Sequence, residues 1–299
     1  LLGQSTNQIV EGSDLIFIEP DNDIFYDCEV VFFATPHGVS MNLVNLFINK
    51  NIKVIDLSAD FRIKDIGIWE EWYNIPHSQE ELLSESVYGL AELNSSKIES
   101  ARLVAVPGCY PTASLLAILP LLSSKFKIES IIIDAKSGIT GAGRQKVEDG
   151  LSEEVKENFK AYGVDGHRHL PEIKEISELV SGYPINLNFI PHLIPAMRGI
   201  YSTIYIQLQE TIDLNIQDLY KSFYEDSPNV KIMQSGQVPD IKSVAKTNNC
   251  NISVSNSNIE NQLVVISSID NLVKGAAGQA VECYNLMNGF NQSTGINNG

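Results

Sequence analysis

Residues 29–38 read Glu-Val-Val-Phe-Phe-Ala-Thr-Pro-His-Gly, an apolar run that stops at a Pro-His-Gly turn. The run Glu29–Thr35 is typical of a strand buried in a parallel sheet, because both of its faces are apolar. Ser40 is suited to cap a helix over about Met41–Lys50, and Lys53–Leu57 is a second apolar strand. A strand, a helix and a strand at this spacing form a βαβ unit, which predicts a parallel sheet with a right-handed crossover.

A third strand, Leu103–Val106, is expected to return to this sheet after a polar and aromatic excursion over residues 63–100. A Pro-Gly turn and an apolar helix over Ala113–Leu122 follow it. Cys109 therefore lies at or just before a helix N-terminus, at the carboxyl end of a strand, where open α/β sheets bind ligands. The free N–H groups and the helix dipole there predict a thiol pKa lowered to roughly 3.5–7.5, and hence a nucleophilic thiolate. From these residues alone, a buried structural cysteine is the alternative.

After the helix Ala113–Leu122 the sequence pattern changes to long strand candidates with no regular helices between them. This pattern predicts a second domain built on a mixed or antiparallel sheet. A last helix over Asn271–Met287 is expected to return to the first domain. The strand candidates are Ser130–Ala135, Asn186–Ile190, Gly199–Leu208, Lys231–Met233, Cys250–Val254 and Gln262–Ser268.

Composition narrows the class of partner. The chain has 299 residues, of which 43% are hydrophobic and 19% charged, and this balance is typical of a soluble globular protein. A net charge of −16 argues against nucleic acid or an anionic membrane as a partner, but it leaves an anionic small substrate open. No apolar run reaches the roughly 18 residues of a membrane span. The four cysteines show no CxxC spacing, which favours a reducing, cytoplasmic location.

Residues 166–172, Gly-His-Arg-His-Leu-Pro-Glu, carry two histidines, the side chains best suited to move protons near neutral pH. The proline disfavours helix at the preceding leucine, so we expect both histidines in a loop or just before a helix. In an extended stretch His167 and His169 share one face, while Arg168 points away. Glu172 is placed to orient a histidine through a hydrogen bond. A non-catalytic pair is the alternative.

Three other segments have both a functional and a structural interpretation. The loop Gly141–Gly143 allows a phosphate or a flat ring to approach the backbone, or it is a plain turn. The segment Pro191–Ile200 is a substrate wall or a connector, and its His192 is the one candidate third ligand for a metal held by the histidine pair. We expect no metal. Gly275–Gln279 allows a ligand or a neighbouring helix to come close. Four of the five arginines lie in Gly-, His- or Asp-containing stretches, which suggests anion recognition.

With these motifs in hand, the chain resembles the N-acetyl-gamma-glutamyl-phosphate reductase family, relatives of the aspartate-semialdehyde dehydrogenases. The resemblance runs essentially from end to end. Its eight segments occur in the family's order: Ala34–Gly38, Asp56–Arg62, Val87–Leu90, Pro107–Thr112, Ser137–Arg144, His167–Glu172, Pro191–Ile200 and Asn271–Ala280.

The resemblance implies an α/β protein with two domains. Residues 1–109, with 272–299 returning, would form a Rossmann-type parallel-sheet domain that binds NADP(H) and is incomplete at its N-terminus. Residues 110–271 would form an α+β catalytic and oligomerisation domain with a mixed sheet. The family also implies a small-molecule acyl phosphate substrate, a homodimer or homotetramer, and a cytoplasmic enzyme of arginine biosynthesis.

The resemblance also implies a mechanism. Cys109 attacks the acyl phosphate of N-acetyl-glutamyl phosphate, phosphate leaves, and NADPH reduces the resulting thioester to the semialdehyde. His169 is implied as acid/base partner, with His167 and Glu172 in support. The substrate-binding residues would be Arg144, Arg198 and His192. The cofactor-binding residues would be Pro36, Ser137, Gly138, Gly141, Gly143 and Gly278.

One family feature is missing from the sequence. The Gly-rich G-x-x-G-x-x-G turn that cradles the cofactor phosphates is absent, and Leu1 resembles a point well inside the first domain. We therefore expect an N-terminal truncation, or a chain that lacks the main pyrophosphate contact and binds NADPH weakly. The rival functions are an aspartate-semialdehyde dehydrogenase and a carrier-linked aminoadipyl- or glutamyl-phosphate reductase of lysine or arginine biosynthesis. A non-catalytic truncated subunit and a cofactor-free cysteine hydrolase are the other two.

Overall fold

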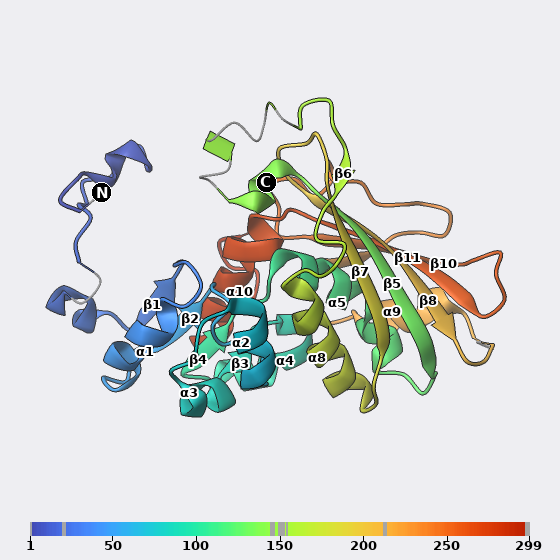
Figure 1. The fold of residues 1–299 in the computed structure, drawn as a ribbon, viewed down its shortest axis with the longest axis horizontal. Helices are drawn as coiled ribbons and strands as arrows, with labels where there is room; N and C mark the ends of the chain where they lie inside the picture. The colour runs from blue at the N-terminus through green and yellow to red at the C-terminus, as the bar shows by residue number, and fades with distance from the viewer. Residues whose placement is uncertain are drawn as a thin grey trace.

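The computed structural model describes residues 2–19, 22–143, 147–148, 153, 155–211 and 214–296. Two sheets organise these residues (Figure 1). A four-stranded sheet has the order β1-β2-β4-β3, and a seven-stranded sheet has the order β6-β7-β5-β8-β11-β10-β9. The expected combination of a parallel-sheet domain and a mixed-sheet domain is confirmed.

The four-stranded sheet is entirely parallel. The helix α1 (Ser40–Ile48) joins the first two strands, so the expected βαβ unit is confirmed. The strands are shorter than the apolar runs that predicted them, because the outer residues of each run leave the ladder. They are β1 (Val30–Phe33), β2 (Lys53–Asp56), β3 (Val87–Tyr88) and β4 (Leu103–Ala105).

Ser40 does not cap α1 as expected. It is the first residue of the helix and is fully buried, and its hydroxyl donates to the carboxylates of Asp56 and Asp60. The cap comes instead from across the sheet edge, because Asp60 accepts the N–H groups of Gly38 and Met41. The start of α1 is thus tied to the end of β2.

The stretch 63–100 holds more regular structure than expected. It contains α2 (Ile66–Tyr73), α3 (Glu80–Glu85), β3 and α4 (Ala91–Glu99). The two-residue strand β3 is too short to show a periodic pattern, so the sequence analysis missed it. After β4, the helix α5 (Cys109–Leu122) begins four residues before the predicted Ala113. Pro111 is tolerated in its first turn, where no backbone N–H is needed for an intrahelical bond.

The seven-stranded sheet is mixed, as expected, with parallel pairs β5·β7 and β9·β10 and four antiparallel pairs. The expectation that no regular helices interrupt its strands is wrong. The helix α8 (His169–Ser181) crosses between β5 and β7, and α9 (Ile216–Phe223) follows β8. The strands are β5 (Ile128–Ser137), β6 (Lys160–Ala161), β7 (Asn186–Leu193), β8 (Ile200–Leu208), β9 (Val230–Ile232), β10 (Cys250–Asn256) and β11 (Gln262–Ile269).

The buried apolar residues form separate clusters on the two sheets, and the last helix adds to the one beside β2 and β4. The helix α5 is buried along its whole length after Cys109 and packs, with α8 and α9, against the seven-stranded sheet. The chain ends in a π-helix, η5 (Val273–Ala277), which runs into α10 (Gly278–Met287). Apolar residues of α10 pack with those of β2 and β4, so the chain returns to the four-stranded sheet. Within the described ranges, we find no helix with the length and apolarity of a membrane span.

Candidate active site

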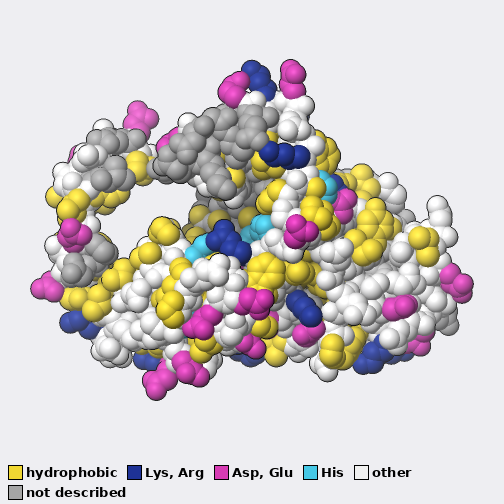
Figure 2. Space-filling view, in the orientation of Figure 1, with side chains coloured by type: hydrophobic (Ala, Val, Ile, Leu, Met, Phe, Trp, Pro, Cys, Tyr) yellow, Lys and Arg dark blue, Asp and Glu magenta, His cyan; other side chains and the backbone are white. Residues whose placement is uncertain are grey.

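A cavity of about 280 Å³ lies where segments of both domains meet. Figure 2 shows histidine and basic side chains next to one another near the middle of one face. Four stretches of the chain supply most of the cavity wall: Val106–Tyr110, Thr140–Gly143, His167–His169 and Asn271–Ala276; His37, Leu57, Arg62, Tyr73 and Tyr162 complete it. The cavity therefore collects residues that are far apart in the sequence.

Cys109 is the first residue of α5, and its partly exposed side chain lines the cavity. The expected position at a helix N-terminus is confirmed. The residue before it must be small, because a Cβ on Gly108 would lie 2.5 Å from His169 Nε2. Glycine thus allows His169 to pack directly on the backbone that precedes the thiol.

The expected lowering of the Cys109 pKa is wrong. Burial of the thiol among its neighbours is the largest effect and raises the pKa to about 11, and the negative charge of Glu172 adds to it. The N–H groups of Tyr110 and Cys109 and the positive charge of Arg62 act in the opposite direction. The helix N-terminus therefore stabilises the thiolate, as expected, but the effect of desolvation on the pKa is larger and of opposite sign. At neutral pH the unliganded site holds a thiol.

His169 lies at the start of α8 and lines the same cavity. Burial, followed by the positive charges around it, lowers the pKa of its imidazole well below the usual value, so the ring is neutral near pH 7. Its Nδ1 atom is buried without a hydrogen-bond partner. His169 is thus a neutral base with spare hydrogen-bonding capacity beside the Cys109 turn.

His167 is the immediate neighbour of His169, with ring centroids 4.9 Å apart. Its Nδ1 accepts the backbone N–H of His169 at 3.1 Å, and burial lowers its pKa to about 4. The expected extended geometry is wrong, because Arg168 is helical (φ −54°, ψ −22°) and α8 already begins at His169. Arg168 consequently does not point away from the histidines but lines the cavity with them.

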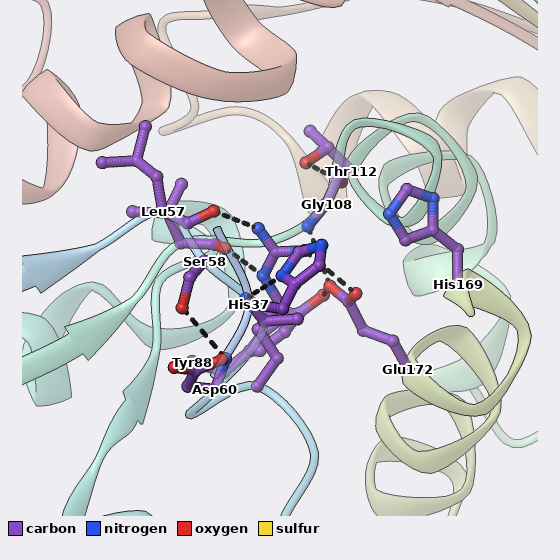
Figure 3. Close-up of polar contacts among 12 residues, drawn as sticks. His37, Leu57, Ser58, Asp60, Tyr88, Gly108, Thr112, His169 and Glu172 are labelled. Atoms are coloured by element: carbon purple, nitrogen blue, oxygen red, sulfur yellow. Dashed lines mark hydrogen bonds and ion pairs between the residues drawn. The ribbon is translucent and has the colours of Figure 1, made fainter. Parts of the chain in front are cut away.

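Glu172 does not bond a histidine, contrary to expectation. Its buried carboxylate accepts the hydroxyl of Tyr88 at 2.8 Å and the N–H of Gly108 at 2.9 Å (Figure 3). Arg62 Nη1 lies 3.5 Å from its other oxygen. Because Gly108 precedes Cys109, Glu172 holds the backbone of the turn that presents the thiol.

Arg62 is a site residue whose role the sequence analysis missed. Its guanidinium donates to the carbonyl oxygens of Leu57 at 2.6 Å and Val106 at 2.7 Å, just beyond the ends of β2 and β4. With Glu172 it forms a buried cross-link below the cavity wall. The sequence signal that could have identified Arg62 is its position in the segment Asp56–Arg62, which begins where the buried strand β2 ends.

The three expected substrate-binding residues are not in the described cavity wall. Arg198 pairs with Asp270, through Nε at 3.1 Å and Nη2 at 3.2 Å. His192 Nδ1 lies 3.0 Å from Asp134, so His192 is not grouped with the histidine pair. Arg144 lies outside the described residues. Their roles stay predictions.

The expected cofactor-binding residues divide into two groups. Gly141 and Gly143 line the cavity, and the φ of +94° at Gly143 favours glycine. A Cβ on Gly278 would lie 2.2 Å from Asn248 Oδ1, so this glycine permits tight packing. Instead Gly275, in the same motif, lines the cavity, and a Cβ there would lie 2.8 Å from Cys109 Cβ. The remaining expected cofactor-binding residues, like Gly278, do not line the cavity; they are Pro36, Ser137 and Gly138.

Two family models match the chain: the semialdehyde dehydrogenase NAD binding domain over residues 2–101 and the semialdehyde dehydrogenase dimerisation domain over residues 109–271. The N-acetyl-gamma-glutamyl-phosphate reductase of Ruthia magnifica subsp. Calyptogena magnifica is 48% identical over 95% of this chain and 82% of the relative. That of Laribacter hongkongensis is 47% identical with the same coverage. The chain belongs to the N-acetyl-gamma-glutamyl-phosphate reductase family. These reductases form a branch of the semialdehyde dehydrogenases, so the resemblance drawn from the motifs is confirmed.

Solved structures agree with this family at the level of the fold. A probable aspartate-semialdehyde dehydrogenase from Pseudomonas aeruginosa superposes with a TM-score of 0.70 at 18% identity, covering 96% of this chain and 86% of that one. Aspartate semialdehyde dehydrogenase II from Vibrio cholerae gives 0.68 at 16% identity, with coverage of 88% and 80%. The two-sheet arrangement is thus shared between this reductase family and its relatives.

Proposed function

We propose that this chain catalyses the NADPH-dependent reduction of N-acetyl-glutamyl 5-phosphate to N-acetyl-glutamate 5-semialdehyde and phosphate, a step of arginine biosynthesis. The observation that carries the proposal is Cys109 at the start of α5, facing a cavity into which α8 brings His169. Relatives that carry the name of this activity are 45–48% identical over nearly the whole chain.

In the proposed first step, the Cys109 sulfur attacks the acyl carbon of the substrate. His169 takes the thiol proton and donates it to the leaving phosphate oxygen as the carbon–oxygen bond breaks. A neutral imidazole suits this role because it is free to accept a proton, and the low pKa of His169 makes it a good donor afterwards. The product of the step is a thioester on Cys109.

After reduction, the carbon–sulfur bond of the resulting thiohemiacetal breaks. The aldehyde leaves, and the Cys109 thiolate takes a proton from solvent. The N–H groups of Cys109 and Tyr110 stabilise the thiolate while it forms and while it leaves. Glu172 and Arg62 keep the turn at Gly108 in place during both steps. His167 positions His169 through its backbone N–H.

The NAD binding domain of the family provides for a nicotinamide cofactor. When bound, NADPH supplies the hydride that reduces the thioester carbon. The residues here fit such a group, because the Gly141–Gly143 loop presents backbone to the cavity and a Cβ on Gly143 would meet nothing within 4 Å. A relative from Candida albicans was solved with NADP. Pro36, Ser137, Gly138 and Gly278 remain proposed supports for this wall, and Arg144, Arg198 and His192 remain proposed contacts for substrate anions.

The test is phosphate-dependent reduction of NADP⁺ with N-acetyl-glutamate semialdehyde, the reverse reaction. It is run on this chain and on a version extended by a family-type segment with the Gly-rich turn. Activity in either form supports the proposal. Activity in neither, but with an aminoadipate or glutamate semialdehyde linked to a carrier protein, would assign the carrier-linked function instead.

The same assay tests the nucleophile. We expect Cys109→Ser to abolish turnover while circular dichroism and the unfolding midpoint stay unchanged, because serine is isosteric but far less nucleophilic. Cys28→Ser, a change at an exposed cysteine away from the cavity, is the matched control and should keep full activity. Turnover retained by Cys109→Ser would overturn the assignment.

A further inference from the structure

Arg168 is a cation in the cavity wall that forms no ion pair with a carboxylate of the residues that the structure describes. It precedes α8, between the two histidines, and lines the cavity. Its guanidinium carbon lies 5.5 Å from the centroid of the Tyr73 ring. Of the arginines that the structure describes, the other three are each paired with a carboxylate: Arg62 with Glu172, Arg102 with Glu85 and Arg198 with Asp270.

The charge of Arg168 acts on two histidines of the same cavity. Its positive charge contributes to the lowered pKa values of His37 and His167, both about 4, so these rings are neutral near pH 7. Arg62 and Glu172 are two charges that act on the Cys109 thiol. Arg168 therefore adds a positive charge to the wall of the cavity that Cys109 also lines.

We propose that Arg168 binds the α-carboxylate of the substrate and selects acyl phosphates that carry one. The proposal rests on the proposed function, in which the acyl carbon and its phosphate lie at Cys109. The α-carboxylate is at the other end of the carbon chain, so its binding group must lie in the cavity but apart from the sulfur. A guanidinium binds a carboxylate through two parallel hydrogen bonds, and the Tyr73 ring limits its orientations. In a chain of net charge −16, a cation in the cavity wall attracts an anion to this place.

The experiment compares Arg168→Gln and Arg168→Lys with wild type on two aldehydes that differ only in the carboxylate. These are N-acetyl-glutamate semialdehyde and 4-acetamidobutanal. We expect Arg168→Gln to lower kcat/KM for the first aldehyde by about tenfold or more, as for loss of a charged hydrogen bond, and for the second by less than about twofold. Arg168→Lys, which keeps the charge without the fork, should lie between. Arg102→Gln removes an exposed arginine and should change neither value.

Calorimetric titration provides a readout that does not need turnover. N-acetyl-glutamate should bind wild type at least about tenfold more tightly than 4-acetamidobutyrate does, and Arg168→Gln should remove this preference. A wild type that shows the preference but no reductase activity would contradict the proposed function alone. Equal losses with both aldehydes, an unchanged Arg168→Gln, or a raised KM for inorganic phosphate with both aldehydes would each overturn the carboxylate assignment.

Discussion

At the residue scale, the thiol of Cys109 is subject to two opposing effects. The first turn of α5 provides N–H groups that stabilise a thiolate, while burial among Tyr110, His169 and the Gly275 turn favours the thiol. Burial is the larger effect, and the pKa is raised to about 11. The resting site is therefore a neutral thiol beside a neutral imidazole, and in the proposed reaction the proton must pass from the thiol to His169 during the attack.

This protonation state predicts the pH dependence of alkylation. A thiol whose pKa is about 11 is less than one part in a thousand thiolate at pH 7, and this fraction rises about tenfold with each pH unit. We expect the iodoacetamide rate at Cys109 in the unliganded protein to rise in this way from pH 7 to 10. The rate is measured by mass spectrometry of the Cys109 peptide, with exposed Cys28 as the internal reference. A rate that already levels off below pH 8 would mean a lowered pKa and would contradict the prediction.

At the element scale, the π-helix η5 forms part of the wall around the nucleophile. It places Gly275 against Cys109, and its Lys274 is fully buried. The Nζ of Lys274 donates to Glu92 at 2.6 Å and to Glu282 at 2.7 Å, which ties η5 to α4 and α10. A charged side chain buried with two carboxylates holds its segment in place, because breaking such a group leaves uncompensated charge. The helices α4 and α10 thus fix the segment that contacts Cys109.

We expect Gly275→Ala to lower kcat by roughly a hundredfold, because the added methyl group would lie 2.8 Å from Cys109 Cβ and must displace it. The overpacking should cost only about 1–3 kcal/mol of unfolding free energy, measured by urea titration. Gly67→Ala is the matched control at the start of α2, where an added Cβ meets only a carboxylate oxygen at 3.3 Å. A Gly275→Ala enzyme with wild-type kcat would show that this contact does not position the nucleophile.

At the scale of the whole molecule, the helices that the structure describes around the seven-stranded sheet gather on one of its faces. The helices α5, α8 and α9 pack against that face. On the opposite face Ile132 of β5 and Tyr205 of β8 are paired in register, and they are 47% and 37% exposed. The neighbouring Ile131 and Ile133 are buried, so the alternation along β5 is clear. Exposed apolar side chains on the outer face of a family dimerisation domain are suited to contact a second copy of the chain.

We therefore expect the protein to be a homodimer or homotetramer in solution and Ile132→Asp to weaken this association. A charge at the centre of an apolar interface must be desolvated without a partner. Light scattering after size-exclusion chromatography measures the mass of each form. Leu179→Asp, a change on the exposed side of α8, is the control and should leave the mass unchanged. If Ile132→Asp keeps the wild-type mass, the interface lies elsewhere.

The sequence by itself determined the main strands of both sheets and five residues that line the cavity: Cys109, Gly141, Gly143, His167 and His169. Apolar runs and turn residues predicted the βαβ unit and the mixed sheet, and the Pro-Gly turn predicted Cys109 at the start of a helix. These inferences succeed because periodicity and capping act between residues only a few positions apart. The short strand β3 and the helices between the later strands carry weaker local patterns and were missed.

Only the tertiary structure decided what these residues do to one another. Glu172 accepts the N–H of Gly108, which is 64 positions away, instead of a nearby histidine. Arg198 is paired with Asp270, while Arg168 lines the cavity wall with no ion pair to any carboxylate in the described ranges. The Cys109 pKa follows from burial by segments far apart in the chain rather than from its own helix. Desolvation and charge act through space, so their balance is determined only when the folded chain has brought these groups together.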